Sequence, residues 1–346
     1  MGQQTNIQWA DDTHNFWRGC SRVSEGCRNC YAETLVENRM AKMHYDLAMS
    51  GSKLSSVHFY KEIGKPSFPL WGKGAPRIRS VDFAAPLRWN KKPLVCDRCG
   101  EMFALPHSSY SQFCESCNST AFHRRRVFSL SLGDWLDEEV PIEWLADMLD
   151  VIRQCPNLDF LLLTKRPENF KFRLQFANGH CAKIGDLMKY EQDQYMQTAF
   201  WIADWLEAKP PANIWLGTSV ENQKTAEERI AQLLLIPARV RFLSVEPLLG
   251  PIDLIKASAG IVLGGKNMIH WAIFGGESGP GARPCRLEWI RNGLKQCAMA
   301  GIAPFVKQLG SCAASDYETV GKIKDKKGGD MNEWPNDLRV RQFPQQ

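Results

Sequence analysis

Three cysteines near the amino terminus stand close enough in the chain to bind one metal centre. They are Cys20, Cys27 and Cys30. They lie on a glycine-bearing loop between a possible strand around 15–17 and an expected helix over 31–48. A 4Fe–4S cluster held only by protein usually takes four cysteines, so a trio leaves one iron open for another ligand. The alternative is a structural zinc site completed by His14 or a distant cysteine. The trio favours the iron–sulfur cluster.

Four further cysteines form two Cys-x2-Cys pairs. These are Cys96 with Cys99 and Cys114 with Cys117, and 14 residues separate the pairs. Two such pairs provide a closed tetrahedral set of thiolates, which is typical of a zinc ribbon. A closed set leaves no position for a substrate, so we expect structural zinc, with rubredoxin-like iron as the alternative. The pattern predicts a zinc-ribbon insertion over 93–123.

Basic and aromatic residues surround this second cluster. Between positions 88 and 126, seven lysines and arginines stand against three acidic residues, a net charge of +4. The interleaved aromatic residues are Trp89, Phe103, Tyr110, Phe113 and Phe122. Basic charge with aromatic rings can bind a nucleic-acid backbone and stack its bases. Alternatively, the rings form the small core of the ribbon and the basic side chains are solvated.

From position 127 onward, short apolar runs alternate with helical segments. We expect strands within 127–134, 159–167, 214–222, 241–247, 271–281 and 304–310, and helices over 141–155, 222–236 and 286–301. Continuously apolar strands are typical of a parallel sheet that is buried on both faces. The alternation predicts an α/β fold, and we favour a partial (βα) TIM-like barrel over a doubly wound sheet.

Polar residues follow the expected strands, and a barrel gathers strand ends at one mouth. They are Asp134, Thr164, Lys165, Ser219, Glu221, Glu246, Glu277 and Lys307. Lys165 with Arg166 could clamp a phosphate, or cap a strand at the surface. The run GGESGPG at 275–281 could bring backbone N–H groups to an anion, or form a plain tight turn. Cys285, just beyond it, could donate a hydrogen atom or be an inert buried thiol.

Composition limits the class of protein. The chain has 346 residues, of which 44% are hydrophobic and 23% are charged, so wholesale disorder and a fibrous repeat are excluded. No apolar run reaches the ~20 residues of a membrane span, and the start lacks the pattern of a signal peptide. We therefore expect a cytoplasmic protein with reduced thiols and no membrane partner. The net charge of +5 permits an anionic partner.

These patterns divide the chain into four regions. Residues 1–92 form the amino-terminal part of the barrel with the cluster loop, and 93–123 form the zinc ribbon. Residues 124–310 complete the barrel, and 311–346 form a tail that wraps the outside. Within the first region, 51–76 is rich in Gly, Ser, Pro and Lys and is expected to be irregular.

Seven segments together resemble the phage-associated three-Cys-motif family. They are WRGCSRVSEGCRNCYAE, FLLLTKRPEN, IWLGTSVENQ, RFLSVEPLLGPIDL, GGESGPGARP, FVKQLG and GGDMNEWPNDLRVRQFP. The resemblance covers nearly the whole chain apart from the insertion. It implies a barrel of radical S-adenosylmethionine (radical SAM) type, comparable with spore photoproduct lyase, with Cys20, Cys27 and Cys30 as the cluster ligands.

One departure from typical radical SAM enzymes concerns the spacing of the trio. Their usual pattern is Cys-x3-Cys-x2-Cys with an aromatic residue before the last cysteine. Here six residues separate the first two cysteines, Asn29 precedes Cys30, and Tyr31 follows it. The adenine contact usually made at that aromatic position is therefore not carried over.

The expected function is that of a radical SAM enzyme, which generates a 5′-deoxyadenosyl radical to modify or repair a nucleic-acid base or nucleotide. The residues expected to hold S-adenosylmethionine are Ser219, Glu221, Glu246, Gly275, Gly276 and Glu277. Those expected to bind substrate are Asp134, Lys165, Arg166 and Lys307, and the catalytic candidates are Cys285 and Tyr31. Flavodoxin or ferredoxin would supply electrons, and a partner protein could take part. The alternative is a non-catalytic, zinc-dependent nucleic-acid-binding phage accessory protein.

Overall fold

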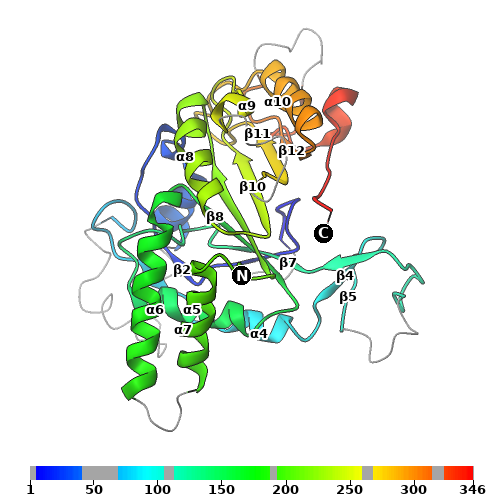
Figure 1. Ribbon diagram of the computed structural model, residues 1–346. Helices are drawn as coiled ribbons and strands as arrows, with labels where there is room; N and C mark the ends of the chain where they lie inside the picture. Colours follow the sequence, from blue (N-terminus) through cyan, green and yellow to red (C-terminus); the bar gives the residue numbers. More distant parts are fainter. Residues whose placement is uncertain are drawn as a thin grey trace.

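A seven-stranded parallel sheet organises the fold (Figure 1). The computed structural model describes residues 5–40, 69–104, 113–187, 193–258, 268–313 and 323–345. In spatial order the strands are β1 (Asp12–His14), β7 (Arg126–Ser129), β8 (Asp159–Thr164), β9 (Ile214–Ser219), β10 (Val240–Val245), β11 (Trp271–Gly275) and β12 (Ala303–Gln308). Each strand runs parallel to its neighbours.

The spatial order of these strands follows their order in the chain. A doubly wound sheet reverses its strand order at a switch point, and the described strands show no reversal. The sheet instead curls into an open part of a barrel. A mixed α/β fold with a curled parallel sheet was expected, and it is confirmed. All carboxyl ends of the strands consequently lie along one edge.

Helices cover one face of this sheet (Figure 1). The longer ones are α5 (Ile142–Arg153), α6 (Phe170–Leu187), α7 (Asp193–Leu206), α8 (Gln223–Leu235) and α10 (Leu287–Ala300). The shorter ones are α1 (Tyr31–Thr34), a π-helix (Leu35–Met40), α4 (Ala85–Trp89), α9 (Leu254–Ala257) and the 3-10 turns Glu25–Cys27, Pro167–Asn169, Met331–Glu333 and Asn336–Leu338. The three expected helices are present as α5, α8 and α10. Gly301 ends α10 with a φ of 66°, a conformation that glycine adopts without strain.

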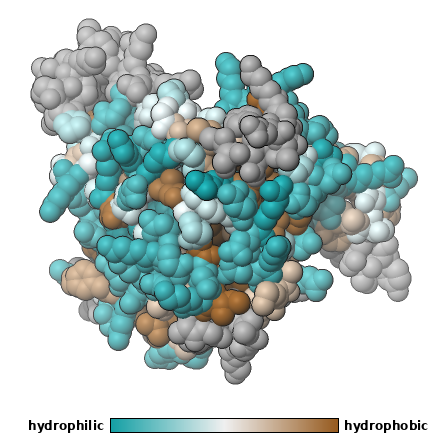
Figure 2. All heavy atoms as spheres, turned by 90° about the horizontal axis from the view of Figure 1, so that it is seen from above, coloured by the Kyte–Doolittle hydropathy of each residue, from teal (hydrophilic) through white to brown (hydrophobic). Residues whose placement is uncertain are grey.

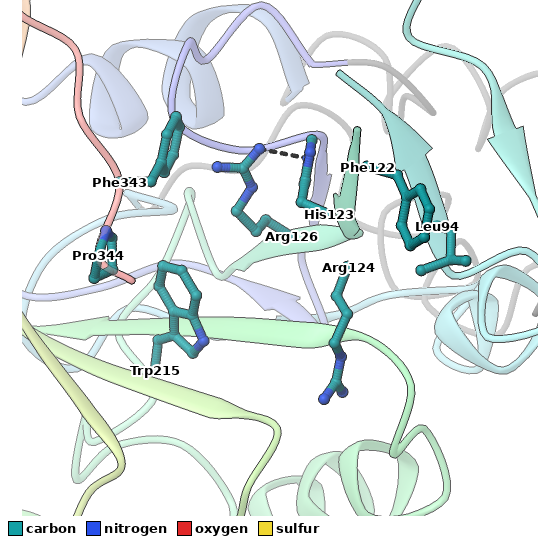
Figure 3. Close-up of a pocket in the computed structure, with 8 residues that line it drawn as sticks. All are labelled: Leu94, Phe122, His123, Arg124, Arg126, Trp215, Phe343 and Pro344. Carbon is teal, nitrogen blue, oxygen red and sulfur yellow. Dashed lines mark hydrogen bonds between the residues drawn. The ribbon is translucent and has the colours of Figure 1, made fainter. Parts of the chain in front are cut away.

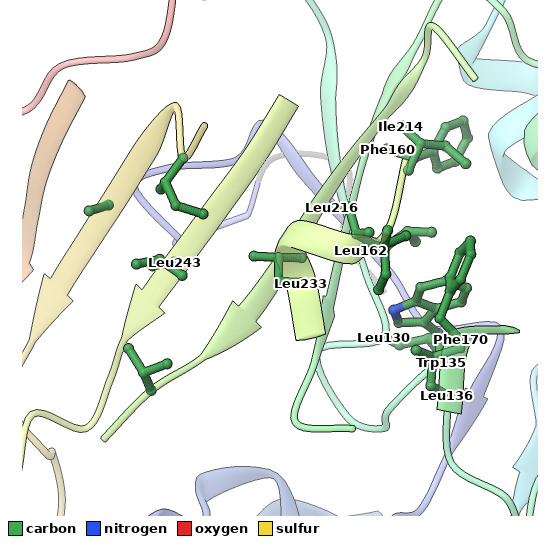
Figure 4. Packing of buried hydrophobic residues seen from close by; sticks show 14 of the residues in the cluster. Leu130, Trp135, Leu136, Phe160, Leu162, Phe170, Ile214, Leu216, Leu233 and Leu243 are labelled. Atoms are coloured by element: carbon green, nitrogen blue, oxygen red, sulfur yellow. The ribbon is translucent and has the colours of Figure 1, made fainter. Parts of the chain in front are cut away.

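Alternating side chains of the strands build two cores. Phe160 and Leu162 of β8 point into the larger core beneath the helices, whereas Leu161 points into a smaller core on the opposite, inner face. Figure 4 shows the larger core, where Leu162 and Leu216 of the sheet lie with Leu233 of α8. Burial on both faces explains why the strands are apolar without alternation.

The inner face carries an aromatic cluster. Trp271 of β11 is fully buried at its centre. Trp9 lies 6.2 Å from Trp271 and Phe343 lies 5.2 Å from it, measured between ring centroids. The indole of Trp271 also donates a hydrogen bond to the carbonyl of Gln342 at 2.8 Å. Segments from near both ends of the described chain therefore cover the inner face together.

The insertion forms a sheet of its own. Its antiparallel strands, in the order β5-β4-β6, are β4 (Leu94–Cys96), β5 (Met102–Phe103) and β6 (Phe122–Arg124). β6 leads directly into β7, so this small sheet projects from the amino-terminal end of the main one (Figure 1). Tyr110, one of the aromatic residues noted in the sequence, lies outside the described residues.

The first strand differs from the sequence-based expectation, and the first helix is described only in part. The first strand is 12–14 and not 15–17, because the Asn15 side chain accepts a hydrogen bond from the backbone N–H of Leu132 at 2.7 Å and leaves the sheet. Trp17–Arg18 forms β2, which pairs antiparallel with β3 (Ile78–Arg79). The helix expected over 31–48 is helical as far as Met40. Positions 41–48 of that helix, 51–68 of the expected irregular stretch and 314–322 of the tail lie outside the described residues.

The surface seen in Figure 2 is mainly hydrophilic, and its hydrophobic side chains lie in several separate groups. Among the described helices, none combines the length and the apolar character that crossing a membrane requires.

Substituting Gly217 by alanine should destabilise the protein. A Cβ at this position of β9 would lie 2.4 Å from the ring of Phe242 on the inner face. Overpacking of a buried site costs roughly 1–3 kcal/mol, which urea unfolding can measure. Gly179 in α6 is the matched control, because a Cβ there meets nothing within 4 Å and should stabilise the helix by about 0.5–1 kcal/mol. Equal effects at the two positions would contradict the packing described here.

Candidate functional site

The four cysteines of the insertion converge on one point. The Sγ atoms of Cys96, Cys99, Cys114 and Cys117 all lie within 4.8 Å of one another. Cys96 is 3.5 Å from Cys117, and Cys99 is 3.5 Å from Cys114. A tetrahedral ion with metal–sulfur bonds of about 2.3 Å would separate its sulfurs by about 3.8 Å. This group could therefore bind one metal ion.

The two Cys-x2-Cys pairs adopt the same turn. The N–H of Cys96 donates to the carbonyl of Glu101, and the N–H of Cys114 donates to that of Ser119, at 2.9 and 2.8 Å. Each turn closes on a residue with positive φ, Gly100 at 73° and Asn118 at 57°. Glycine and asparagine tolerate that conformation best. The thiol pairs are thus preset by two local turns before any ion binds.

Backbone groups favour the thiolate at one of these ligands. Hydrogen bonds from the N–H groups of Cys99 and Arg98 lower the pKa of Cys96 to about 6, although desolvation opposes them. A metal ion binds the thiolate form of cysteine, so this position needs little proton loss at neutral pH.

The amino-terminal trio lies at the other end of the main sheet. Cys20 follows β2, Cys27 ends the 3-10 turn Glu25–Cys27, and Cys30 directly precedes α1. Cys20 and Cys30 contact the same small apolar cluster, which includes Leu132, beyond the carboxyl end of β7. Among the described residues, the trio does not form a set as compact as that of the insertion. A four-iron cluster, being wider than one ion, needs its ligands further apart.

Burial keeps two thiols of the trio protonated in the absence of metal. Desolvation raises the pKa of Cys20 to about 12, although the guanidinium of Arg166 opposes it. Desolvation also raises the pKa of Cys30, and backbone hydrogen bonds from Glu33 and Ala32 oppose it. Metal binding here would displace these protons.

Asp134 and Arg166 hold the first cysteine in place. Arg166 donates to the Sγ of Cys20 at 3.5 Å and to the carbonyl and hydroxyl oxygens of Ser21 at 2.9 and 2.7 Å. Asp134 in turn accepts from Arg166 at 3.1 Å and from the hydroxyl of Thr164 at 2.7 Å. Both charged groups are buried, so the structure employs them in positioning the loop. Direct contact of either one with a substrate stays a prediction.

Glu221, just after β9, anchors the middle of the loop. It accepts a hydrogen bond from Ser24 at 2.9 Å and pairs with Lys165 at 2.9 Å and Arg229 at 3.0 Å. Gly26 lies so close that a Cβ there would sit 2.4 Å from the Glu221 side chain. The loop therefore needs glycine at this position. The strand-end residue Ser219 is also engaged, because its carbonyl accepts from Arg229 at 2.8 Å.

Glu277, after β11, anchors the last part of the loop. Its carboxylate accepts from Asn29 at 2.9 Å and from Arg283 at 2.6 Å. Arg283 also donates to the carbonyl of Glu25 at 3.0 Å. Desolvation would raise the pKa of Glu277, but the hydrogen bonds from Arg283 outweigh it and hold the pKa below its ordinary value. Glu277 therefore stays ionised and continues to accept the hydrogen bonds that hold the loop.

Protein atoms occupy the space next to the two glycines expected to seat S-adenosylmethionine. A Cβ on Gly275 would lie 2.4 Å from Oε1 of Glu246, and one on Gly276 would lie 2.2 Å from the carbonyl oxygen of Leu309. These glycines permit close packing at the strand end. Their direct contact with a cofactor stays a prediction, and the packing supplies a reason for glycine without one.

Two strand-end groups, Glu246 and Lys307, and Tyr31 at the start of α1 do not anchor the loop. Lys307 pairs with Glu246 at 2.9 Å, and both side chains remain partly exposed. Tyr31 is 55% exposed and donates its hydroxyl to the carbonyl of Ser131 at 2.8 Å. Tyr31, Glu246 and Lys307 are thus the expected site residues best placed to meet a ligand.

Two expected candidates lie elsewhere. His14, the alternative fourth ligand of the trio, is buried with its Nε2 3.2 Å from the carbonyl of Phe83, and desolvation lowers its pKa to about 4. Its ring packs at right angles to Phe16 in the larger core. Cys285 is 1% exposed in that same core, where desolvation raises its pKa to about 12. The structure thus gives both residues packing roles.

The partners of these carboxylates could not be predicted from the sequence. Ser24, Asn29, Arg229 and Arg283 complete the anchors, yet nothing in their local patterns marks them. The carboxylates themselves were visible because they follow apolar strands.

Residues 4–336 match a family described as a protein of unknown function, DUF5131. The chain belongs to this family. No curated protein and no solved structure matches it significantly. The match spans the cysteine loop, the four-cysteine insertion and all seven strands of the main sheet, so both cysteine groups lie within the family's extent.

Replacing Glu221 by glutamine should destabilise the protein in a pH-dependent way. Desolvation alone would raise the pKa of Glu221, but Lys165 and Arg229 outweigh it and hold the pKa below the ordinary value of 4.5. Its stabilising contribution is therefore complete above pH 4.5 and is lost as the pH falls through the folded-state pKa. Urea unfolding near neutral pH should show a loss of roughly 3 kcal/mol in the variant.

The matched control is Glu288→Gln, an exposed carboxylate on α10 3.8 Å from Arg286. It should change stability by less than about 0.5 kcal/mol. A Glu221→Gln deficit that stays constant down to acidic pH would contradict the ion-pair anchor.

Replacing Cys114 by serine should remove about one metal ion per chain, because the substitution takes one of the two buried thiols from the group of four. Elemental analysis of the purified variant measures the loss. Cys312→Ser, outside both cysteine groups, should keep the full metal content. Unchanged metal in Cys114→Ser would show that the group does not hold an ion.

Proposed function

We propose that the protein is a radical SAM enzyme that modifies or repairs a nucleic-acid base or nucleotide. The observation that carries this proposal is the anchoring of a three-cysteine loop over the carboxyl edge of a curled parallel sheet. In barrels this edge is where catalytic groups gather. Carboxylates that follow β7, β9 and β11 tie this loop to that edge and so keep its three cysteines there.

The donor set fits a 4Fe–4S cluster with one iron open. Cys20, Cys27 and Cys30 would hold it, and Arg166 would donate a hydrogen bond to one ligand sulfur. Hydrogen bonds to ligand sulfurs are one of the means by which proteins tune such clusters. When bound, the cluster and S-adenosylmethionine together supply a 5′-deoxyadenosyl radical, with electrons from a flavodoxin or ferredoxin.

The chain's own residues would position the cofactor and the substrate and would exclude water from them. Tyr31, Glu246 and Lys307 would contact the cofactor or the substrate, since the other charged strand-end groups are occupied by the loop. Glu246 can accept a hydrogen bond from an amino or hydroxyl group, and Lys307 can donate one to a carboxylate or a phosphate. The resemblance to the three-Cys-motif family, with its likeness to spore photoproduct lyase, supports a nucleic-acid substrate.

The insertion would be a zinc ribbon that serves the fold. Its four thiolates close the coordination sphere, and closed sites of four cysteines are typical of structural zinc. Its place beside the amino-terminal ends of the strands puts it away from the cysteine loop.

Anaerobic reconstitution with iron and sulfide tests the proposal. The protein should take up roughly four iron atoms in addition to one zinc, show the visible absorbance of an iron–sulfur cluster, and cleave S-adenosylmethionine under reducing conditions. Cys27→Ala should lose the iron and the cleavage but keep the zinc. Cys312→Ser should keep all three properties.

A colourless protein with one zinc ion at each cysteine group would overturn the proposal. It would favour the alternative, a non-catalytic zinc-dependent nucleic-acid-binding accessory protein, whose binding should weaken steeply with salt.

A further inference from the structure

A pocket of about 300 Å³ lies where the insertion meets the main sheet (Figure 3). Its lining comes from four parts of the chain. These are Leu94 of β4, the stretch from β6 into the start of β7, Trp215 near the start of β9, and Phe343 with Pro344. At this volume the pocket stands at the lower limit of small-ligand sites, enough for one base with its sugar.

The pocket is separate from the cysteine loop. Arg126 and Trp215 stand at the amino-terminal ends of their strands, whereas the loop lies beyond the carboxyl ends. Six residues of β9 span roughly 20 Å. The aromatic cluster around Trp271, to which Trp215 and Phe343 of the lining belong, fills the inner face between the pocket and the loop. A ligand in this pocket is therefore held apart from anything that reacts beside the trio.

The lining combines aromatic faces with guanidinium groups and contains no carboxylate among the described residues. Figure 3 shows Trp215 and Phe343 on one side of the pocket, Phe122 on the other, and the two arginines between them. Arg126 stacks on Phe343 at 3.8 Å from the ring centroid and pairs with Asp11 at 3.3 Å. Arg124 lies 3.4 Å from Asp159 and its Nε and Nη2 donate to the backbone carbonyls of residues 156–158, while its side chain remains 30% exposed.

Phe122 stands apart from the other aromatic residues of the insertion. It packs edge-on against Phe103, with ring centroids 5.8 Å apart, and it also lines the pocket. Trp89 is buried with the main core, and Phe113 is exposed. Among the described residues, β6 thus offers this pocket both an aromatic surface, Phe122, and a cation, Arg124.

We propose that this pocket binds one base of a single-stranded nucleic acid. The base lies against Phe122, and Arg124 contacts the adjoining phosphate at the rim. An aromatic ring can stack on any base, and a guanidinium group binds a phosphate of any nucleotide. The pocket therefore binds the strand without sequence specificity. It serves as an anchor at the end of the sheet opposite the cysteine loop, and this role does not depend on radical chemistry.

The test compares two fluorescent probes of equal length and charge, a short oligothymidylate and an abasic phosphodiester. The full zinc-loaded chain is used without S-adenosylmethionine, and binding is followed by anisotropy. One stacked base should make the oligothymidylate bind roughly tenfold more tightly than the abasic strand. Phe122→Leu should reduce this preference, while zinc content shows that the insertion remains folded.

Arg124→Gln should weaken binding of both probes and lower the salt dependence by about one counterion. The matched control is Arg286→Gln, an exposed arginine next to α10 that lies outside the pocket. It should leave both probes unaffected. Equal affinity for the two probes, or equal effects of the two arginine substitutions, would overturn the proposal. Because no cofactor is present, either failure is distinct from a failure to cleave S-adenosylmethionine.

Discussion

Buried carboxylates at the strand ends are the constraint on which the cysteine loop depends. A buried charge is costly unless it is paired and hydrogen-bonded, and once paired it tolerates little displacement. Glu221 meets this requirement with two cations and with Ser24 of the loop. Glu277 does so through Arg283 and Asn29, and Asp134 through Arg166. The cysteine loop is consequently held at three points by these charged groups, which lie far from it in the sequence.

The chain order of the strands makes this arrangement possible. Because each strand lies beside its predecessor, the polar residues that follow β7, β9 and β11 come to one edge despite large separations in sequence. Ser24 and Glu221 are 197 positions apart, and Asn29 and Glu277 are 248 apart. The same order places the amino-terminal strand ends, the insertion and the pocket at the opposite edge. One curled sheet thereby provides two chemically different ends.

Local patterns were enough to predict β7 to β12, three helices and the four-cysteine group, since hydrophobic runs, the glycine cap at Gly301 and the cysteine spacing act over short distances. The functions of Asp134, Glu221 and Glu277 could not be predicted in the same way. A carboxylate after a strand looks the same whether it meets a ligand or a distant arginine. The α6–α7 pair was also missed, because a network around Asp150 of α5, which accepts from Thr198 at 2.7 Å, stabilises it through tertiary contacts. Gly275 and Gly276 predicted a loop. The sequence did not indicate that Glu246 and Leu309 would pack directly against these two glycines.

The aromatic cover of the inner face bears on how the chain folds. Trp271 contacts both Trp9 and Phe343, residues more than three hundred positions apart, so this core contains some of the longest-range contacts that the chain can make. Forming such a contact closes a long loop of the chain. The conformational entropy lost in closing it makes the contact slow to form. The outer layer of helices can assemble step by step with its strands, whereas the interior must be completed late. Until then a row of tryptophans and phenylalanines stays open to water, which makes this stage the one most exposed to aggregation.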